Sequence, residues 1–395
     1  MKLHKGFSVL AVILTSSTIS AGGQQPKWIA EGPNVEDKEL FLELPMKVFG
    51  NQLLIEVEVG GVPRQFLFDT GSPSMMSAAL AAELKLEVID RIKGRDSHGA
   101  VIDTEIVQSD LTLGGTTFYK VPIFVADFPK PPKCLFDGVL GSEMLPLCAW
   151  QIDVPESTVR CSTMLTKLEH IKKAKQQRLH DFGYPHAPIL DVRFTSKAKS
   201  KVLFDTGSPD FMAISPPDFE GAERSGGIAR TRAGTGSIGG SIGGLAPEKD
   251  QLRVELDIMR LGNVELKNVG AILRDSPPSL IGASVFDHFV VTLDSSNATA
   301  YFDQYRNGPF ARQSYGFSLS FEEEQPKVSL VWDESPAESA GLKVGQRVTA
   351  INGQPTDASC DGIRKTMRAM SDGNTIAVEW EGGEAELTRQ PWVDQ

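Results

Sequence analysis

Two copies of one short motif place a carboxylate in the same local context at two distant points of the chain. The heptapeptide Leu-Phe-Asp-Thr-Gly-Ser-Pro spans 67–73 and recurs unchanged at 203–209, which sets Asp69 and Asp205 136 residues apart. A chance repeat of this length has a probability on the order of one in a million or less. Two carboxylates held close together repel one another where water is scarce, so such a pair shares one proton. The ionised member can then activate water while the protonated member donates, which predicts general acid–base chemistry.

A single D-T-G-S sequence is a weak signal, because Asp, Gly and Ser are common turn residues. Here both copies follow an apolar strand, and each is followed by an apolar-apolar-Gly triplet, at 139–141 and at 280–282. Further segments recur in the same order, namely 113–114 with 261–262, 121–125 with 269–273, and 150–153 with 291–294. The repeated order indicates that one folding unit has been duplicated.

Each unit is expected to consist mostly of β-strands. Residues 55–59 alternate apolar and polar side chains, as a strand with one buried face does. Short apolar runs alternate with Gly, Pro and Asp breakers along both units. A short helix is expected over Ser77–Leu86. A second, solvated helix is expected in the linker 164–184, because apolar residues recur at helical spacing from Leu165 to Ile171 among several basic residues.

The duplicated motifs resemble those of the retropepsin and pepsin aspartic peptidases, in which D-T-G-S follows an apolar strand and precedes an apolar-apolar-Gly triplet. The resemblance covers roughly residues 40–302. It implies a mainly β fold with two retropepsin-like acid-protease lobes in one chain, at 36–163 and 185–305. It also implies an aspartic endopeptidase that acts on polypeptides, with Asp69 and Asp205 as the catalytic pair.

The resemblance further implies supporting roles for the residues after each Asp. The supporting set is Thr70, Gly71, Ser72, Thr206, Gly207 and Ser208. The threonine hydroxyls would link the two turns, and the glycines would allow close backbone approach because they lack a Cβ. The serines would donate hydrogen bonds to the outer carboxylate oxygens and favour ionisation. Which Asp acts as base and which as acid stays open.

In these peptidases a hairpin flap covers the substrate. The corresponding segments here are about 93–107, with a tip at Ser97–Gly99, and the glycine-rich 233–244, which we expect to form a mobile hairpin over the cleft. Neither segment contains an evident flap tyrosine, which departs from the pepsin pattern. The glycine-rich segment also contains G-x-G-x-x-G and G-x-S-x-G patterns, but the helix that a dinucleotide site or a serine nucleophile needs does not follow them.

The segment 310–391 has a different pattern. Residues 335–342 (S-P-A-E-S-A-G-L) followed by 351–353 (I-N-G) resemble a bacterial PDZ domain, although Gln346 stands where that pattern usually has Asp. The resemblance implies an α+β domain whose groove takes an extended peptide as an added strand and whose loop N–H groups bind the C-terminal carboxylate of the peptide. The implied loop and groove strand comprise Tyr315, Gly316, Phe317, Ser318 and Leu319, and a helix near Cys360–Met370 would form the other wall.

The four cysteines are not arranged as metal ligands. They lie at 134, 148, 161 and 360, and none forms a C-x-x-C pair, so a zinc cluster is not expected. Cys148 and Cys161 flank an apparent hairpin with a turn near 154–156. A disulfide and two unpaired buried thiols both remain open there. No metal or organic cofactor is implied.

The N-terminus resembles an export signal. Lys2 and Lys5 precede an apolar core at 7–14, and small residues with Ala21 as a possible cleavage position follow, so we expect a signal peptide at 1–23. A periplasmic or secreted protein without a later membrane span is therefore expected. The alternative is a hydrophobic N-terminal segment of a cytosolic protein.

Charge and composition exclude one class of partner. The net charge is −11 and no long basic run occurs, whereas a nucleic-acid binder usually concentrates basic residues on one face. We expect a monomer that acts on polypeptide substrates, with a possible C-terminal peptide ligand for the PDZ-like domain. The rival hypothesis is a non-enzymatic peptide-binding protein with the same cleft and groove. A further alternative pairs the lobes between two chains.

Overall fold

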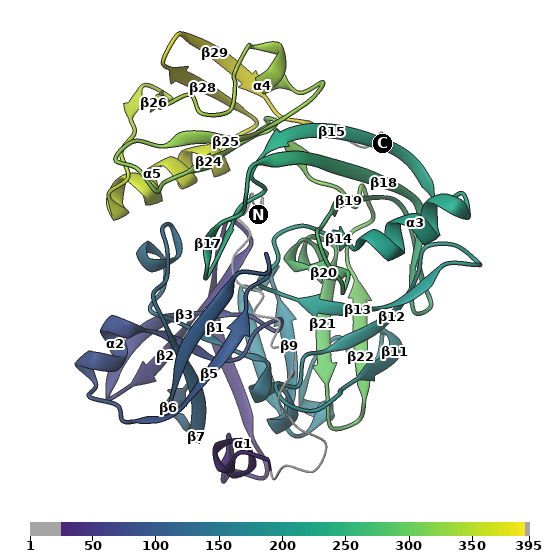
Figure 1. Cartoon of the computed structure of the whole chain (residues 1–395). Coiled ribbons are helices and arrows are strands. Elements are labelled where there is room, and N and C mark those ends of the chain that lie inside the picture. The colour runs from purple at the N-terminus through teal and green to yellow at the C-terminus, as the bar shows by residue number, and fades with distance from the viewer. Residues whose placement is uncertain (1–24, 392–395) are drawn as a thin grey trace.

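The computed structural model describes residues 25–391, and the export signal expected at 1–23 lies outside this range. Figure 1 shows two lobes, with a smaller C-terminal module lying across one end of them. Strands dominate both lobes, and the mainly β fold class predicted from the sequence is confirmed.

The first lobe is built on a hairpin-rich sheet whose strands enclose the first D-T-G-S turn. Its elements are α1 (Lys27–Glu31), β1 (Phe41–Phe49), β2 (Gln52–Val59), β3 (Val62–Phe68), β4 (Met75–Ser77), α2 (Ala78–Glu83), β5 (Val88–Arg95), β6 (Val101–Leu113), β7 (Thr116–Ala126), β8 (Gly138–Leu140), β9 (Ala149–Asp153) and β10 (Thr158–Ser162). The predicted helix near 77–86 is present as α2. Ser77 caps it, because its hydroxyl accepts a hydrogen bond from the Leu80 N–H at 3.1 Å.

The second lobe repeats this plan. Its elements are β11 (Lys175–His180), β12 (Ile189–Arg193), β13 (Lys199–Asp205), β14 (Met212–Ile214), α3 (Pro216–Arg224), β15 (Ile228–Gly236), β16 (Gly240–Ser241), β17 (Gly244–Leu245), β18 (Lys249–Leu261), β19 (Val264–Leu273), β20 (Leu280–Gly282), β21 (Phe289–Asp294) and β22 (Thr299–Gln304). In each lobe the strand before the Asp pairs in parallel with the strand of the Gly triplet, β3 with β8 and β13 with β20. The sequence repeat is therefore a structural repeat.

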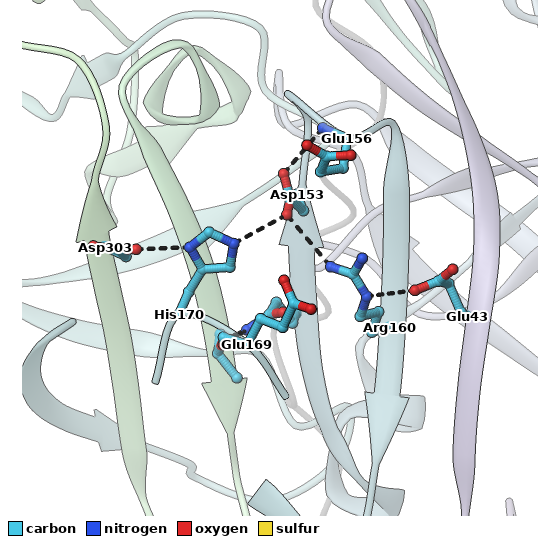
Figure 2. A network of polar contacts seen from close by, with 9 residues as sticks. Glu43, Asp153, Glu156, Arg160, Glu169, His170 and Asp303 are labelled. Atoms are coloured by element: carbon cyan, nitrogen blue, oxygen red, sulfur yellow. Dashed lines mark hydrogen bonds and ion pairs between the residues drawn. The ribbon is translucent and has the colours of Figure 1, made fainter. Parts of the chain in front are cut away.

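A shared sheet joins the lobes on the side away from the module. Its strands run in the order β1, β10, β9, β21, β22, β11, so that β9 of the first lobe pairs with β21 of the second. Figure 2 shows polar side chains that cross this junction. His170 contacts Asp153 at 3.3 Å and Asp303 at 2.7 Å, while Arg160 contacts Asp153 at 3.4 Å and Glu43.

The prediction of a solvated linker helix at 164–184 is wrong. The segment contains a short 3-10 turn (Leu165–Lys167), a left-handed residue at His170 and then strand β11. Strand β11 pairs with β22 and continues into β12. The helical spacing of the apolar residues from Leu165 to Ile171 does not decide the conformation of the segment. Strand β22 would otherwise be an unpaired edge of the interlobe sheet, and its backbone offers hydrogen-bond partners to β11.

The C-terminal module has its own small core. Its elements are β24 (Phe317–Ser320), β25 (Lys327–Trp332), α4 (Pro336–Ser339), β26 (Val348–Ile351), β27 (Gln354–Pro355), α5 (Cys360–Ser371), β28 (Thr375–Trp380) and β29 (Gly383–Thr388). The predicted helix near 360–370 is present as α5. Its buried side chains, which include Ile363 and Met367, pack with those of the module's strands. The module is therefore an α+β unit, as expected.

The module is attached to both lobes. Cys360 at the start of α5 forms a disulfide with Cys134 of the first lobe, and β25 pairs antiparallel with β15 of the second. A short pairing of β23 (Gln313–Ser314) with β30 (Gln390–Pro391) closes the module at its base. The module thus bridges the lobes.

All four cysteines are paired. The disulfide considered for Cys148 and Cys161 is present across β9 and β10, with the Cα atoms 5.7 Å apart. The Cys134–Cys360 disulfide was not predicted, because its partners are 226 residues apart and no local pattern relates them. Between residues 25 and 391, no helix is both long and apolar enough to span a bilayer.

Candidate active site

Asp69 and Asp205 lie at the ends of equivalent strands, where the two lobes meet. Asp69 follows β3 and Asp205 is the last residue of β13, and the second half of each strand is buried on both faces. The backbone N–H of Asp69 donates to Leu140 of the Gly triplet strand at 3.0 Å, so the ladder continues up to the carboxylate. Both Asp residues are buried, as are the Thr and Gly that follow them.

The two turns are cross-linked by their threonines. The N–H of Thr70 donates to Oγ1 of Thr206 at 2.9 Å, and the N–H of Thr206 donates to Oγ1 of Thr70 at 3.1 Å. Each hydroxyl in turn donates to a carbonyl oxygen of the other lobe, Thr70 to Phe204 and Thr206 to Phe68, both at 2.7 Å. These four hydrogen bonds satisfy six buried polar groups and hold the two turns in register. The role expected for the threonines matches this geometry.

The glycines of the turns lie against the carboxylates of the opposite lobe. A Cβ placed on Gly71 would lie 2.3 Å from Oδ1 of Asp205, and one placed on Gly207 would lie 2.3 Å from Oδ2 of Asp69. No side chain fits at either position. The same distances show that each turn lies against the carboxylate of the other lobe, so the carboxylates of Asp69 and Asp205 lie close together.

The glycines of the triplets support the turns from below. A Cβ on Gly141 would lie 2.2 Å from the backbone of Pro73 and Ser74, and one on Gly282 would lie 2.3 Å from the carbonyl oxygen of Asp210. The close packing explains why an apolar-apolar-Gly triplet follows each D-T-G-S motif.

The inner carboxylate oxygens are hydrogen-bonded by the backbone of the turns. Oδ1 of Asp69 accepts from Gly71 N–H at 2.8 Å, and Oδ1 of Asp205 accepts from the N–H groups of Gly207 and Ser208 at 2.9 and 3.2 Å. Among the groups of residues 25–391, neither Oδ2 has a hydrogen-bond partner. The two outer oxygens are therefore the atoms available to a reacting molecule.

The hydrogen bonds expected from the serine hydroxyls differ from prediction. The Ser72 hydroxyl donates to the carbonyl oxygen of Pro73 at 3.1 Å, and Ser208 contributes its backbone N–H to Asp205 instead of a hydroxyl. The prediction that the hydroxyl donates to the outer oxygen is therefore wrong for Ser208. The Ser72 hydroxyl also bonds to its own chain, but hydrogen bonding by the Ser72 side chain lowers the pKa of Asp69, as expected.

Burial and mutual repulsion raise the pKa values of both carboxyls. Burial raises the pKa of Asp69 well above its usual range, and the neighbouring charge of Asp205 raises it further. Burial also raises the pKa of Asp205, to about 6, although Asp69 and Arg274 favour its ionised form. A pair with these properties holds one proton from about pH 6 upward, until the second carboxyl also ionises.

Sequence reasoning missed Arg274, a cationic neighbour of the pair. It directly follows β19, it is 7% exposed, and its charge lowers the pKa of Asp205. Its charge also lowers the pKa of His98 in the first-lobe hairpin tip, where burial is the main cause of the lowered value. Arg274 has no counterpart in the repeated motif, so only a three-dimensional arrangement could have identified it.

Glu143 is a second buried acid beside the first turn. Its two carboxyl oxygens accept from the Ser74 N–H at 3.1 and 3.0 Å. Burial raises its pKa to about 7. Burial also raises the pKa of Tyr184, and the charge of Glu143 raises it further. Within residues 25–391, no three His, Cys, Asp or Glu side chains converge to form a metal site.

The two predicted flap segments are hairpins. The first is β5–β6, whose turn at Asp96–Ala100 contains the expected tip. The second is β15–β18, whose glycine-rich end carries the small β16–β17 hairpin and no helix. The two hairpin tips touch, because the Ser241 hydroxyl donates to Asp96 Oδ2.

The groove of the C-terminal module faces the second lobe. The predicted loop leads into β24, with Gly316 in the left-handed region (φ +90°) and Tyr315 and Leu319 buried. A cavity of about 120 Å³ lies between β24 and α5, and its lining includes Phe317, Ser318, Met367 and Met370 of the module and Ile238, Gly239 and Arg253 of the second lobe. The groove is thus shared between the module and the β15–β18 hairpin.

Comparison with known proteins agrees with this geometry. Residues 55–144 match the family model described as aspartyl protease, and residues 327–376 match that of the PDZ domain. No curated protein matches the sequence. Similar solved structures include an aspartic proteinase from Irpex lacteus (14% identity, 69% of this chain and 100% of that chain covered, TM-score 0.46). Another is basic 7S globulin from soybean (8% identity, 67% and 95% covered, TM-score 0.40). Residues 55–144 are therefore similar to the aspartyl protease family, and residues 327–376 form a PDZ domain.

Proposed function

We propose that the protein is an aspartic endopeptidase that hydrolyses polypeptides with the carboxyl groups of Asp69 and Asp205. One observation carries the proposal. The reciprocal Thr70–Thr206 hydrogen bonds hold two buried carboxylates against each other, each with its Oδ1 bonded to the backbone and its Oδ2 left for a reacting group. A chain that used the lobes only to bind peptides would have no need for this paired arrangement.

The chemistry follows from a shared proton. With one proton on the pair, the ionised carboxylate takes a proton from water as the oxygen attacks the peptide carbonyl carbon. The protonated carboxyl donates to the carbonyl oxygen, and a proton then passes to the leaving nitrogen as the C–N bond breaks. The pair is singly protonated above about pH 6, where Asp205 has ionised and Asp69 has not. Activity is therefore expected to rise through about pH 6 and to fall once Asp69 also ionises.

The test compares the wild type with Asp69→Asn and Asp205→Asn on an unfolded protein mixture from acidic to neutral pH. Each variant is expected to lose cleavage by several orders of magnitude, because an amide can neither take up nor donate the shared proton. Asp257→Asn serves as the matched control, since Asp257 is exposed on the second lobe away from the pair. Circular dichroism establishes that every variant is folded.

Two results contradict the proposal: an inert wild type over the whole range, or an Asn variant that cleaves as fast as the wild type. In either case the peptide-binding hypothesis takes precedence. The chain then uses its cleft and PDZ groove for recognition alone. A statine-type inhibitor that fails to raise the melting temperature of the wild type supports that outcome, since such inhibitors mimic the tetrahedral intermediate.

We also propose a C-terminal peptide as ligand of the PDZ domain. The conformation of the Gly316 loop and the cavity between β24 and α5 support an added-strand mode of binding. Acidic residues at 322–324 follow β24, so acidic peptides are expected to bind less well. Binding that is unchanged when the C-terminus of the peptide is amidated contradicts recognition of the carboxylate.

The proposed location is outside the cytoplasm, in the periplasm or secreted, and the proposed oligomeric state is a monomer. Two disulfides support this compartment, because such bonds persist in oxidising environments. Having both Asp-bearing lobes in one chain supports a monomer. Fractionation of the expressing cell and sedimentation of the purified protein test the two statements.

A further inference from the structure

The glycine-rich end of the second-lobe hairpin reaches into the first lobe. We call residues 237–245 the hairpin tip. Ile242, at its centre, is 9% exposed and packs in an apolar cluster that otherwise comes almost entirely from the first lobe and the N-terminal segment. The members of the cluster include Trp28, Leu54, Leu67, Met75, Ile106, Phe124, Phe136 and Val139. One side chain of the second lobe thus fills an apolar site of the other.

This apolar site lies on the same side of the sheet as the Asp69 carboxylate. Side chains alternate along a strand, so Leu67 and Asp69 point to one face and Phe68 to the other. The packing agrees, because Leu67 and its register partner Val139 lie in the cluster with Ile242, while Phe68 lies in the main core. The tip therefore places an apolar side chain beside the catalytic turn, on the side from which a substrate must approach.

A polar contact fastens the tip to the first-lobe hairpin. The hydroxyl of Ser241 donates to Oδ2 of Asp96, whose Oδ1 accepts from the N–H groups of His98 and Ala100 at 3.0 and 2.7 Å. Backbone and side chain are close here as well, since a Cβ on Gly243 would lie 3.0 Å from the Cβ of Ala100. The two hairpins thus meet tip to tip.

The base of the tip is bonded to the PDZ domain. Ser237 N–H donates to the carbonyl oxygen of Ser329 on β25 at 2.7 Å, directly after the residues that pair β15 with β25. Gly236 permits this approach, because it is in the left-handed region (φ +125°) and a Cβ there would lie 2.1 Å from the Ser329 carbonyl oxygen. Figure 1 shows β15 and β18 running beneath the module and the hairpin around β17 descending toward the first lobe.

These contacts have a consequence for access to the pair. Asp69 is 0% exposed and Asp205 is 1% exposed, although a hydrolase must bring both a peptide and water to them. With the tip in place, Ile242 fills the apolar site on the Asp69 side of the sheet, so a substrate side chain cannot occupy that site.

We propose that the hairpin tip is an internal plug, in which Ile242 takes the place of a substrate side chain, and that it must withdraw before a polypeptide enters. The proposal rests on the proposed peptidase function and deepens it. The plug has three points of attachment: Ile242 in the apolar site, Ser241 on Asp96, and Ser237 on β25. Since the third lies in the PDZ domain, a change in that domain is transmitted to the cleft through one hydrogen-bonded strand.

A disulfide lock tests the proposal in the full chain. The double variant Ala100→Cys/Gly243→Cys is designed to join the two hairpin tips. A Cβ on residue 243 would lie 3.0 Å from the Cβ of Ala100, nearer than the roughly 3.8 Å of a disulfide, and 2.4 Å from Asp96 Oδ2, so the two tips must shift apart slightly as the bond forms. The variant is oxidised with diamide and then titrated with a fluorescein-labelled statine-type inhibitor, whose binding needs an open cleft but no turnover. The single variants Ala100→Cys and Gly243→Cys, oxidised in the same way, are the controls.

The expected result is that the lock forms and weakens inhibitor binding by at least about tenfold relative to the single variants, because the open form is no longer populated. Equal binding by locked and single variants overturns the proposal. Failure of the cysteines to join under oxidation also overturns it, since the tips then do not meet in solution.

A second variant distinguishes a plug from a flap that grips the substrate. Ile242→Ala is expected to increase inhibitor affinity and cleavage rate by roughly tenfold, because removing buried methyl groups weakens the closed form. A substrate-gripping flap predicts a decrease in both, which overturns the proposal. Val62→Ala is the control, because it also replaces a β-branched apolar side chain by Ala, but at a position of the first lobe that is 44% exposed.

Failure of the proposed function gives a different result. If no variant and no wild-type protein binds the inhibitor, the peptidase function is excluded, and amide hydrogen exchange then decides the role of the tip. Ile242→Ala is expected to raise exchange at 96–100 and 237–245 by at least about tenfold, with no change in Val62→Ala. Unchanged exchange at both segments shows that Ile242 does not hold the tip in place and overturns the plug.

Discussion

At the residue scale, identical motifs have been given unequal surroundings. Asp69 and Asp205 share a heptapeptide, yet only Asp205 has a buried arginine, Arg274, within electrostatic range. The cationic neighbour favours ionisation at one site of the pair, which is what a dyad with one acidic and one basic member requires.

Replacing Arg274 is expected to shift the pH dependence of cleavage. Arg274 lowers the pKa of Asp205, so Arg274→Gln raises that pKa and moves the acidic limb of kcat/KM to higher pH, by on the order of one unit. The pH profile of kcat/KM measures the shift. Arg260→Gln, at an exposed arginine paired with Glu265, is the control. An unchanged acidic limb in Arg274→Gln shows that Arg274 does not influence the pair.

The raised pKa of Glu143 predicts how the free energy of unfolding changes with pH. Its pKa in the folded protein is about 7, above the ordinary value of 4.5, so the folded state holds this proton more tightly than the unfolded state. The group therefore stabilises the wild type less as the pH rises from about 4.5 through 7, by a total of about 3 kcal/mol. Glu143→Gln has no proton to lose and should not show this part of the decline.

The measurement is the free energy of unfolding in urea at pH 5 and pH 8. The difference between the two pH values should be smaller in Glu143→Gln than in the wild type, and unchanged in Glu87→Gln, where the replaced carboxylate is exposed. Equal differences in all three proteins contradict the role assigned to burial.

At the element scale, hydrogen bonds between the two D-T-G-S turns hold the site together. Thr206→Val keeps the shape of the side chain but leaves the Thr70 N–H and the Phe68 carbonyl oxygen without partners in a buried site. Two such groups cost roughly 2–5 kcal/mol in unfolding free energy. Urea unfolding of Thr206→Val measures the loss. Thr299→Val, whose hydroxyl bonds only to Asn297 in an exposed turn, should change little. A loss of similar size in both variants contradicts the importance of the cross-link.

Strand β11 shows how an element is decided by its neighbours. The apolar residues just before it, from Leu165 to Ile171, have helical spacing, and the segment is rich in Lys, yet β11 pairs with β22 at the edge of the interlobe sheet. The D-T-G-S turns behaved differently, because their glycines, threonines and preceding apolar strands all favour the same local conformation. Local and global preferences agree at the site and disagree at the linker.

At the scale of the whole molecule, the PDZ domain fastens the lobes together. The Cys134–Cys360 disulfide closes a far longer stretch of chain than Cys148–Cys161, with separations of 226 and 13 residues. Chain entropy makes the longer bridge more stabilising by roughly 2 kcal/mol. Cys134→Ser/Cys360→Ser should therefore lower the melting temperature more than Cys148→Ser/Cys161→Ser, and should speed proteolytic release of the PDZ domain near 306–312. Equal effects of the two pairs contradict this anchoring role.

The sequence by itself determined the duplicated lobes, the facing pair of Asp residues and the α2 and α5 helices, whereas at Cys148 and Cys161 it left open the choice between a disulfide and free thiols that the structure decided. Each of these depends on a local pattern or on an exact repeat, and both are visible along one dimension of the chain. Tertiary structure alone decided the strand identity of β11, the Cys134–Cys360 bridge, the placement of Arg274 beside Asp205 and the insertion of Ile242 into the first lobe. In these cases the partners are distant in sequence and unrelated in pattern, so the packing of the lobes and the PDZ domain brings them together and no local preference does.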